Sequence, residues 1–166
     1  CLPEECNRRI VDVTADVNLC YSEHARRYLH TAGLPKERVF VTGSPMAEVL
    51  RTNLHKIDAS TILSELHLKK RGYILLSAHR EENIDTLENF SSLMEAVNAV
   101  AARYDMPVLY SCHPRSRKFI EKRGFHFDSR VISHRPLGFH DYNHLQQNAF
   151  TVISDSGTLP EEASFF

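Results

Sequence analysis

The chain of 166 residues is 42% hydrophobic, which is enough to bury a sizeable core in one domain or in parts of two. Its formal net charge of -1, with acidic and basic residues interspersed, removes the electrostatic case for bulk nucleic-acid binding, and no apolar run approaches membrane-spanning length. The four cysteines show neither metal-type nor disulfide-framework spacing. We therefore expect a cytoplasmic protein with reduced thiols, no bound metal, and neither a nucleic-acid nor a membrane partner.

Both ends of the chain suggest a piece of a larger protein. The sequence opens on Cys1 without a methionine and stops at Phe166, inside a predicted helix. We expect a fold that is truncated at both ends, and no catalytic activity from this piece by itself.

Predicted helices and strands alternate along the first 72 residues. The elements expected in order are a helix with a charged head, a strand at 17–21, a helix capped by Ser22 and closed by Gly33, a strand at 39–42, a helix at 46–50, and a modest helix capped by Asp58. Residues 51–72 are polar and end in the basic turn Lys69-Lys70-Arg71-Gly72. We expect this stretch to cross between two lobes.

From residue 73 onward the alternation becomes regular. The expected strands are 73–77, 108–111, 131–133 and 150–153, and the expected helices are a long one starting near Asp85, a basic one ending at Gly124, one capped by Asp141, and one that begins at Pro160. The spacing of Asp85 and Glu88 resembles a capping box. One face of the long helix is expected to carry Leu87, Phe90, Leu93, Met94, Val97 and Val100.

Strands that alternate with helices over short connections predict an α/β fold with an open parallel sheet and flanking helices. In such sheets ligands bind beyond the carboxyl ends of the strands. Three loops follow predicted strands at that edge, namely His79-Arg80, His113-Pro114-Arg115 and Ser156-Gly157-Thr158. Two histidines, two arginines and a helix start at one edge predict an anion pocket that suits a diphosphate.

Each of these candidates also has a purely structural interpretation. The turn at Ser156-Gly157-Thr158 is equally typical of a well-capped helix start, and a single histidine after a strand is often a hydrogen-bond partner. Glu162 lies one turn into the last helix, where a carboxylate either accepts from the vicinal hydroxyls of a ribose or complements the helix dipole. A serine hydrolase built on Ser156, His79 and Asp155 lacks the nucleophile-elbow pattern, and neither a Walker A loop nor G-x-G-x-x-G is present.

The motifs taken together resemble one family along essentially the whole chain. They are Pro3-Glu4-Glu5-x-Asn7-Arg8, Thr42-Gly43-Ser44-Pro45, Ser77-Ala78-His79-Arg80-Glu81-Glu82-Asn83, His113-Pro114 and Asp155-Ser156-Gly157-x-x-x-Glu161-Glu162. This order is similar to that of the non-hydrolysing UDP-N-acetylglucosamine 2-epimerases. Within that family, three motifs resemble the subgroup that makes UDP-N-acetyl-L-fucosamine from a 6-deoxy-L-talose precursor: Ser-Ala-His-Arg-Glu-Glu-Asn, Gly-Ser-Pro-Met and Asp-Tyr-Asn-His-Leu-Gln.

The resemblance implies a two-lobed glycosyltransferase-B type fold built from two Rossmann-like lobes. Residues 1–50 would end the N-terminal lobe, 51–72 would form the crossover, and 73–166 would form an incomplete C-terminal nucleotide-binding lobe. The implied reaction is C2 epimerisation of a UDP-N-acetylhexosamine by anti elimination and re-addition of UDP, for surface polysaccharide precursors. No cofactor is implied, and the full-length protein is expected to be a homodimer.

The resemblance also implies roles for individual residues. Glu4 and His79 would be catalytic, and the UDP-binding residues would be His79, Arg80, His113, Tyr142, Ser156, Gly157, Thr158 and Glu162. Three departures from the family pattern bear on these roles: Thr158 replaces a second glycine, Pro160 replaces a polar residue, and Glu81 stands at a position that is often basic. A glycosyltransferase of the same fold and a non-catalytic UDP-sugar-binding module remain as alternatives.

Overall fold

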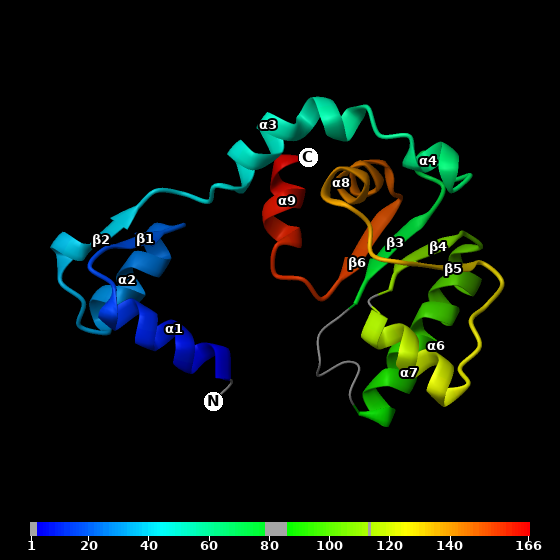
Figure 1. Cartoon of the computed structure of the whole chain (residues 1–166), viewed down its shortest axis with the longest axis horizontal. Coiled ribbons are helices and arrows are strands. Elements are labelled where there is room, and N and C mark those ends of the chain that lie inside the picture. Colours follow the sequence, from blue (N-terminus) through cyan, green and yellow to red (C-terminus); the bar gives the residue numbers. More distant parts are fainter. Residues whose placement is uncertain (1–2, 79–85, 113) are drawn as a thin grey trace. The chain divides into compact units, whose positions relative to one another are not determined.

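The computed structural model describes residues 3–78, 86–112 and 114–166 of the chain (Figure 1). These residues form two compact units, Cys1–Val49 and Leu50–Phe166. The sheet of the second unit carries the pocket described below.

The first unit pairs two short parallel strands with helices. Its elements are α1 (Pro3–Thr14), β1 (Asn18–Cys20), α2 (Glu23–Thr31), the 3-10 turn η1 (Lys36–Arg38) and β2 (Val39–Val41). The Ser22 hydroxyl accepts a hydrogen bond from the Ala25 N–H, and Gly33 follows the helix with a φ of 96°, so both predicted helix ends are confirmed. The helix α3 (Met46–Asp58) then leads into the second unit.

The second unit is an open parallel sheet with helices on both faces. Its remaining elements are α4 (Ile62–Glu65), β3 (Ile74–Ser77), α6 (Leu87–Tyr104), β4 (Val108–Ser111), α7 (Pro114–Arg123), β5 (Val131–His134), α8 (Phe139–Asn148), β6 (Thr151–Ser154) and α9 (Leu159–Phe165). The strand order is β5-β4-β3-β6, and every neighbouring pair is parallel. The predicted α/β fold class with a parallel sheet and flanking helices is therefore confirmed.

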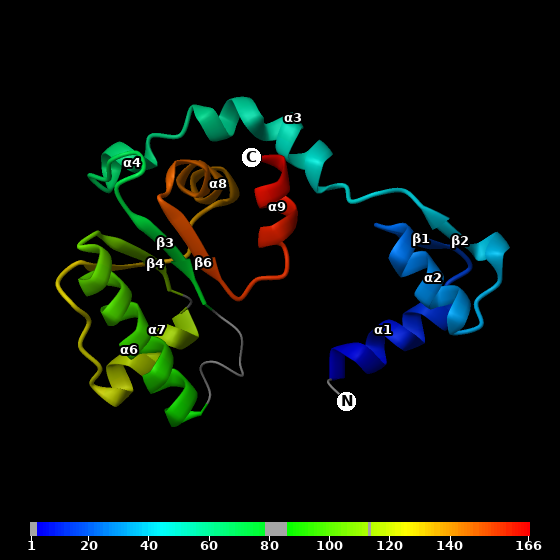
Figure 2. The same cartoon turned by 180° about the vertical axis from the view of Figure 1, so that it is seen from behind.

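Two hydrophobic clusters hold the layers together, one on each face of this sheet. Side chains alternate between the two sides along β3 and the residue before it, so Ile74 and Leu76 pack under α6 and α7, whereas Tyr73 and Leu75 pack under α4 and α8. The same helices flank the sheet when it is seen from behind (Figure 2). A central strand that is buried on both faces needs a continuous apolar run, and Tyr73-Ile74-Leu75-Leu76 supplies one.

Three local predictions are wrong. Asp58 does not begin a helix but ends α3, because that helix continues past residue 50 to bury Ile57 completely. Asp141 lies inside α8, which starts at Phe139 after Gly138, and its carboxylate accepts from the Ser60 hydroxyl at 2.6 Å. Leu87 is 64% exposed at the first position of α6, one residue after the N-cap Thr86. Asp85 itself lies outside the described residues.

Candidate functional site

A pocket of about 260 Å³ opens at the carboxyl edge of the second unit's sheet. Ser77 and Ser111 are the last residues of β3 and β4, and Ser156 lies two residues after β6. These serines meet because the carboxyl ends of parallel strands share one edge of the sheet. The residues that line it are Ser77, Ser111, Pro136, Leu137, Tyr142, Ser156, Thr158, Leu159 and Glu162. The lining thus combines four hydroxyl groups of serine and threonine, one phenol, one carboxylate and a small apolar surface.

Backbone hydrogen bonds align the strand ends that form the pocket. Ser77 is in register with Ser154 across the β3–β6 pair, and the Asp155 N–H donates to the Ser77 carbonyl at 3.3 Å. On the other side the Cys112 N–H donates to the His134 carbonyl at 2.8 Å, which extends the pairing of β4 with β5. The pocket is therefore built on strand ends that are paired with their neighbours.

The turn between β6 and α9 presents hydroxyl groups. The Ser156 and Thr158 hydroxyl oxygens lie 2.9 Å apart, and the Ser156 N–H donates to the Ser154 hydroxyl at 3.0 Å. Thr158 occupies the N-cap position of α9 without a side-chain capping bond, but the Thr158 N–H donates to the Ser156 hydroxyl at 3.4 Å. The turn therefore keeps a structural interpretation beside the ligand-binding one. Two N–H groups of the first turn, those of Glu161 and Glu162, already donate to the Thr158 carbonyl.

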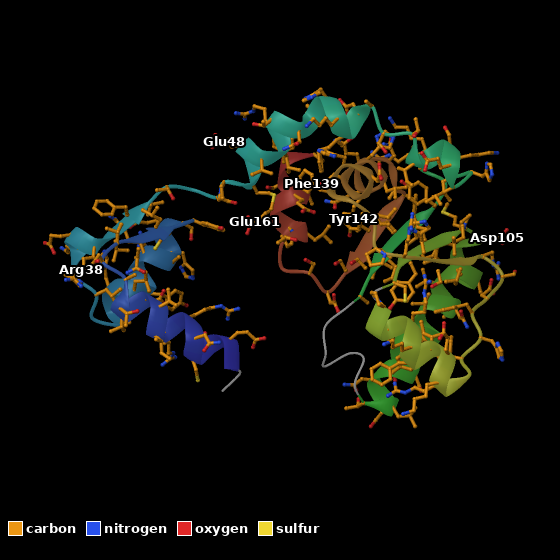
Figure 3. The ribbon with its side chains drawn as sticks, viewed as in Figure 1. Arg38, Glu48, Asp105, Phe139, Tyr142 and Glu161 are labelled. Carbon is orange, nitrogen blue, oxygen red and sulfur yellow. The ribbon has the colours of Figure 1, made fainter. Side chains whose placement is uncertain are left out.

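Two ionisable side chains enter the pocket from α8 and α9. Glu162 is only 9% exposed, and burial raises the pKa of its carboxyl group, with a smaller increase from Glu161 and an opposing influence of the Gln146 amide. Burial likewise raises the pKa of Tyr142, and the hydroxyl of Ser77 lowers the pKa of this phenol in part. Figure 3 labels Tyr142 on α8 and Glu161, the neighbour of Glu162, on α9. The phenol therefore stays protonated at neutral pH and is available as a donor.

The structure brings part of the predicted site together. Tyr142, Ser156, Thr158 and Glu162 all line this one pocket. Gly157 lies in the same exposed turn but is not among the lining residues, and a Cβ placed there would meet no atom within 4 Å, so the turn does not require glycine for space. The roles of all five residues stay predictions.

The other predicted site residues cannot be placed in this pocket. Glu4 is exposed in the first turn of α1, which belongs to the first unit. The predictions for His79, Arg80 and His113 lie outside the described residues.

Some lining residues were not predicted. Ser77 and Ser111 are the last residues of β3 and β4, and Pro136 and Leu137 lie between β5 and α8. The rule that placed the three loops at the carboxyl edge also covers the residues that end the strands, so the two serines had a signal in the sequence. Pro136 and Leu137 had none, because a loop of this length does not reveal which way it turns.

Within the described part of the chain, no three His, Cys, Asp or Glu side chains gather in a way that suits a metal ion. None of the described helices is both long and apolar enough to cross a membrane.

Comparison with known proteins places this fold in a family. The sequence model described as UDP-N-acetylglucosamine 2-epimerase matches residues 1–166. A solved UDP-N-acetylglucosamine 2-epimerase from Rickettsia bellii is 38% identical with a TM-score of 0.85, over 98% of this chain and 43% of that one. The Methanocaldococcus jannaschii enzyme in complex with UDP-GlcNAc and UDP is 25% identical with a TM-score of 0.88, over 99% of this chain and 47% of that one.

A curated relative has a different substrate in its name. The UDP-2,3-diacetamido-2,3-dideoxy-D-glucuronate 2-epimerase of Pseudomonas aeruginosa is 30% identical over 99% of this chain and 45% of its own length. The fold is thus an α/β fold of glycosyltransferase-B type, which the chain shares with these neighbours over about half of their length. The chain belongs to the UDP-N-acetylglucosamine 2-epimerase family.

Proposed function

We propose that this chain supplies the UDP-binding part of a UDP-N-acetylhexosamine 2-epimerase. The observation that carries the proposal is the pocket at the carboxyl edge of the sheet, where Ser77, Tyr142, Ser156, Thr158 and Glu162 converge. The carboxyl edge is where open α/β sheets bind their ligands, and family membership supports the same choice of ligand.

The chemistry of the lining suggests how UDP lies in the pocket. The hydroxyl groups of Ser77, Ser111, Ser156 and Thr158 suit the acceptor oxygens of a diphosphate. The carboxylate of Glu162 suits the two vicinal hydroxyls of a ribose, each of which donates a hydrogen bond. Tyr142, Pro136 and Leu137 offer the aromatic and apolar surface that a uracil ring needs.

In the whole protein this arrangement would serve C2 epimerisation by anti elimination and re-addition of UDP. Glu4 and His79 are the proposed catalytic residues of this chain, and Arg80 and His113, with His79, would stabilise the charge that develops on the departing UDP. Gly157 would let the backbone approach the diphosphate closely. The elimination needs no redox cofactor, because no net oxidation takes place.

The hexosamine is the open part of the proposal. We favour conversion of the 6-deoxy-L-talose form to the L-fucosamine form, because Gly43-Ser44-Pro45-Met46 and Asp141-Tyr142-Asn143-His144-Leu145-Gln146 resemble that subgroup. The relative from Pseudomonas aeruginosa supports variation of substrate within the family. We also propose that the full-length protein is a homodimer in the cytoplasm and serves surface polysaccharide synthesis.

Hydrogen exchange tests the reaction. The full-length protein that contains this chain should incorporate deuterium at C2 when it turns over its UDP-N-acetylhexosamine in D₂O. A glycosyltransferase of the same fold would transfer the sugar to an acceptor and leave C2 protonated, and a binding module would bind UDP without either outcome. Unlabelled C2 under turnover would rule out the epimerase.

A further inference from the structure

Tyr110 is a buried residue that connects two neighbouring strand ends. It lies in β4, where its position pairs with Leu76 of β3, and its hydroxyl donates a hydrogen bond to the Ala78 carbonyl at 3.3 Å. The side chain is completely buried among residues of the α6 and α7 face, and its ring packs edge-on against Phe127 with ring centroids 6.1 Å apart. A polar group buried this deeply needs a partner, and the Ala78 carbonyl provides it.

The location of this contact relates it to the pocket. Ala78 directly follows Ser77, and Tyr110 directly precedes Ser111, and both of these serines line the pocket. Tyr110 itself is not one of the described lining residues, because its side chain points to the other face of the sheet. The phenol thus links the end of β3 to β4 on the face of the sheet opposite the pocket. The link lies next to Ser77 and Ser111, which supply two of the pocket's hydroxyl groups.

The hydrogen-bonding state of the phenol is well defined. Burial raises the pKa of Tyr110, so the phenol keeps its proton and acts as a donor. The hydroxyl of Ser116, which is also completely buried, lowers this pKa in part.

We propose that Tyr110 is a positioning residue for the diphosphate end of the pocket: by holding the Ala78 carbonyl it fixes the end of β3 and, with it, the Ser77 hydroxyl. The inference rests on the proposed function. It assigns to Tyr110 an influence on phosphate binding that does not extend to the nucleoside end of the pocket, where Tyr142 and Glu162 lie on α8 and α9.

Tyr73 offers a matched control. It is a second completely buried tyrosine of the same unit, and its hydroxyl likewise donates to a backbone carbonyl, that of Leu145 in α8. Removing either hydroxyl leaves one buried carbonyl without that donor, so Tyr110→Phe and Tyr73→Phe should lower stability by similar amounts. Only the first substitution removes a hydrogen bond at the end of β3.

The test is calorimetric titration of the 166-residue chain with UDP and with uridine. Tyr110→Phe should weaken UDP binding about threefold to tenfold, the usual range for one lost hydrogen bond, and leave uridine binding unchanged. Tyr73→Phe should leave the ratio of the two affinities as it is in the unsubstituted chain. Thermal melts of both variants show that each is folded before it is titrated.

Two results would overturn the inference, and they are distinguishable. If the unsubstituted chain binds UDP but Tyr110→Phe changes UDP and uridine affinities equally, or changes neither, then Tyr110 has no positioning role and the proposed function stands. If the unsubstituted chain binds no UDP, the proposed function fails and the inference fails with it.

Discussion

Glu162→Gln is the substitution that separates binding from stability most clearly. The carboxylate is proposed to accept hydrogen bonds from the ribose, and a hydrogen bond to a charged group contributes about 1.5–3 kcal/mol. The amide of glutamine keeps one acceptor oxygen but loses the charge, so we expect a loss of about 1–2 kcal/mol, or about 5-fold to 30-fold in UDP affinity. The side chains have nearly the same shape, so the pocket should not collapse.

The same substitution should stabilise the chain at neutral pH. Burial raises the pKa of Glu162 above its ordinary value of 4.5, which means that ionisation is less favourable in the folded chain than in the unfolded chain. For a carboxyl group with a raised pKa, this destabilisation is present above the folded pKa and absent below the unfolded one. Glu162→Gln should therefore raise the melting temperature at pH 7 and change it little below pH 4.5.

Calorimetry with UDP and thermal melts at both pH values measure the two effects. Glu161→Gln is the control, because it makes the same change one residue earlier in α9 at a side chain that does not line the pocket. The control should leave UDP affinity unchanged. With 2′,3′-dideoxy-UDP, which lacks both ribose hydroxyls, the unsubstituted chain and the Glu162→Gln variant should bind equally well. Unchanged UDP affinity in Glu162→Gln would refute the ribose role.

Three further predictions concern the pocket wall, the core and the surface. Tyr142→Ala should weaken UDP binding about threefold to tenfold in calorimetry, because it removes an aromatic contact, and equal affinity would exclude contact with the ligand. Leu109→Ala empties a completely buried site under α8 and should lower the free energy of unfolding in urea by about 2–5 kcal/mol, so a loss below about 1 kcal/mol would contradict the packing described. Hydrogen bonds from Arg130 hold the pKa of Asp128 far below its ordinary value of 3.8, so this pair stabilises the fold above that pH and the contribution is lost as the pH falls. The stability difference between Asp128→Asn and the unsubstituted chain should accordingly be larger at pH 7 than at pH 3, and a constant difference would argue against the pairing.

The sequence predicted helix ends correctly where a capping residue acts on the backbone next to it. Ser22 and Gly33 bound α2 as expected, because a capping hydroxyl and a left-handed glycine act through the adjacent backbone. The parallel sheet followed from its apolar strands and short connections. Asp58 and Asp141 also have the side chains of helix caps, but contacts with distant parts of the chain prevent them from starting helices. Burial of Ile57 extends α3 to Asp58, and the Asp141 carboxylate accepts a hydrogen bond from Ser60, which is 81 residues away in the sequence.

The pocket was predictable in its location and less so in its composition. The carboxyl-edge rule pointed to the loop that holds Ser156 and Thr158, the position of Glu162 in the helix suggested a ribose ligand, and the resemblance to the family added Tyr142; all four residues line the pocket. Ser77 and Ser111 had a signal in the sequence as residues that end strands, but this signal did not show that these two would line the pocket together. Their contribution depends on which strands are neighbours, and the order β5-β4-β3-β6 is a property of the folded sheet.

Amide chemical shifts of the isotopically labelled 166-residue chain, recorded with and without UDP, test the central claim most directly. The pocket assignment predicts that saturable shifts concentrate at Ser77, Ser111, Tyr142, Thr158 and Glu162, and that the amides of β1 and β2 in the first unit stay where they are. Saturable shifts that centre on other residues of the second unit and spare these five would contradict the assignment of the pocket to UDP.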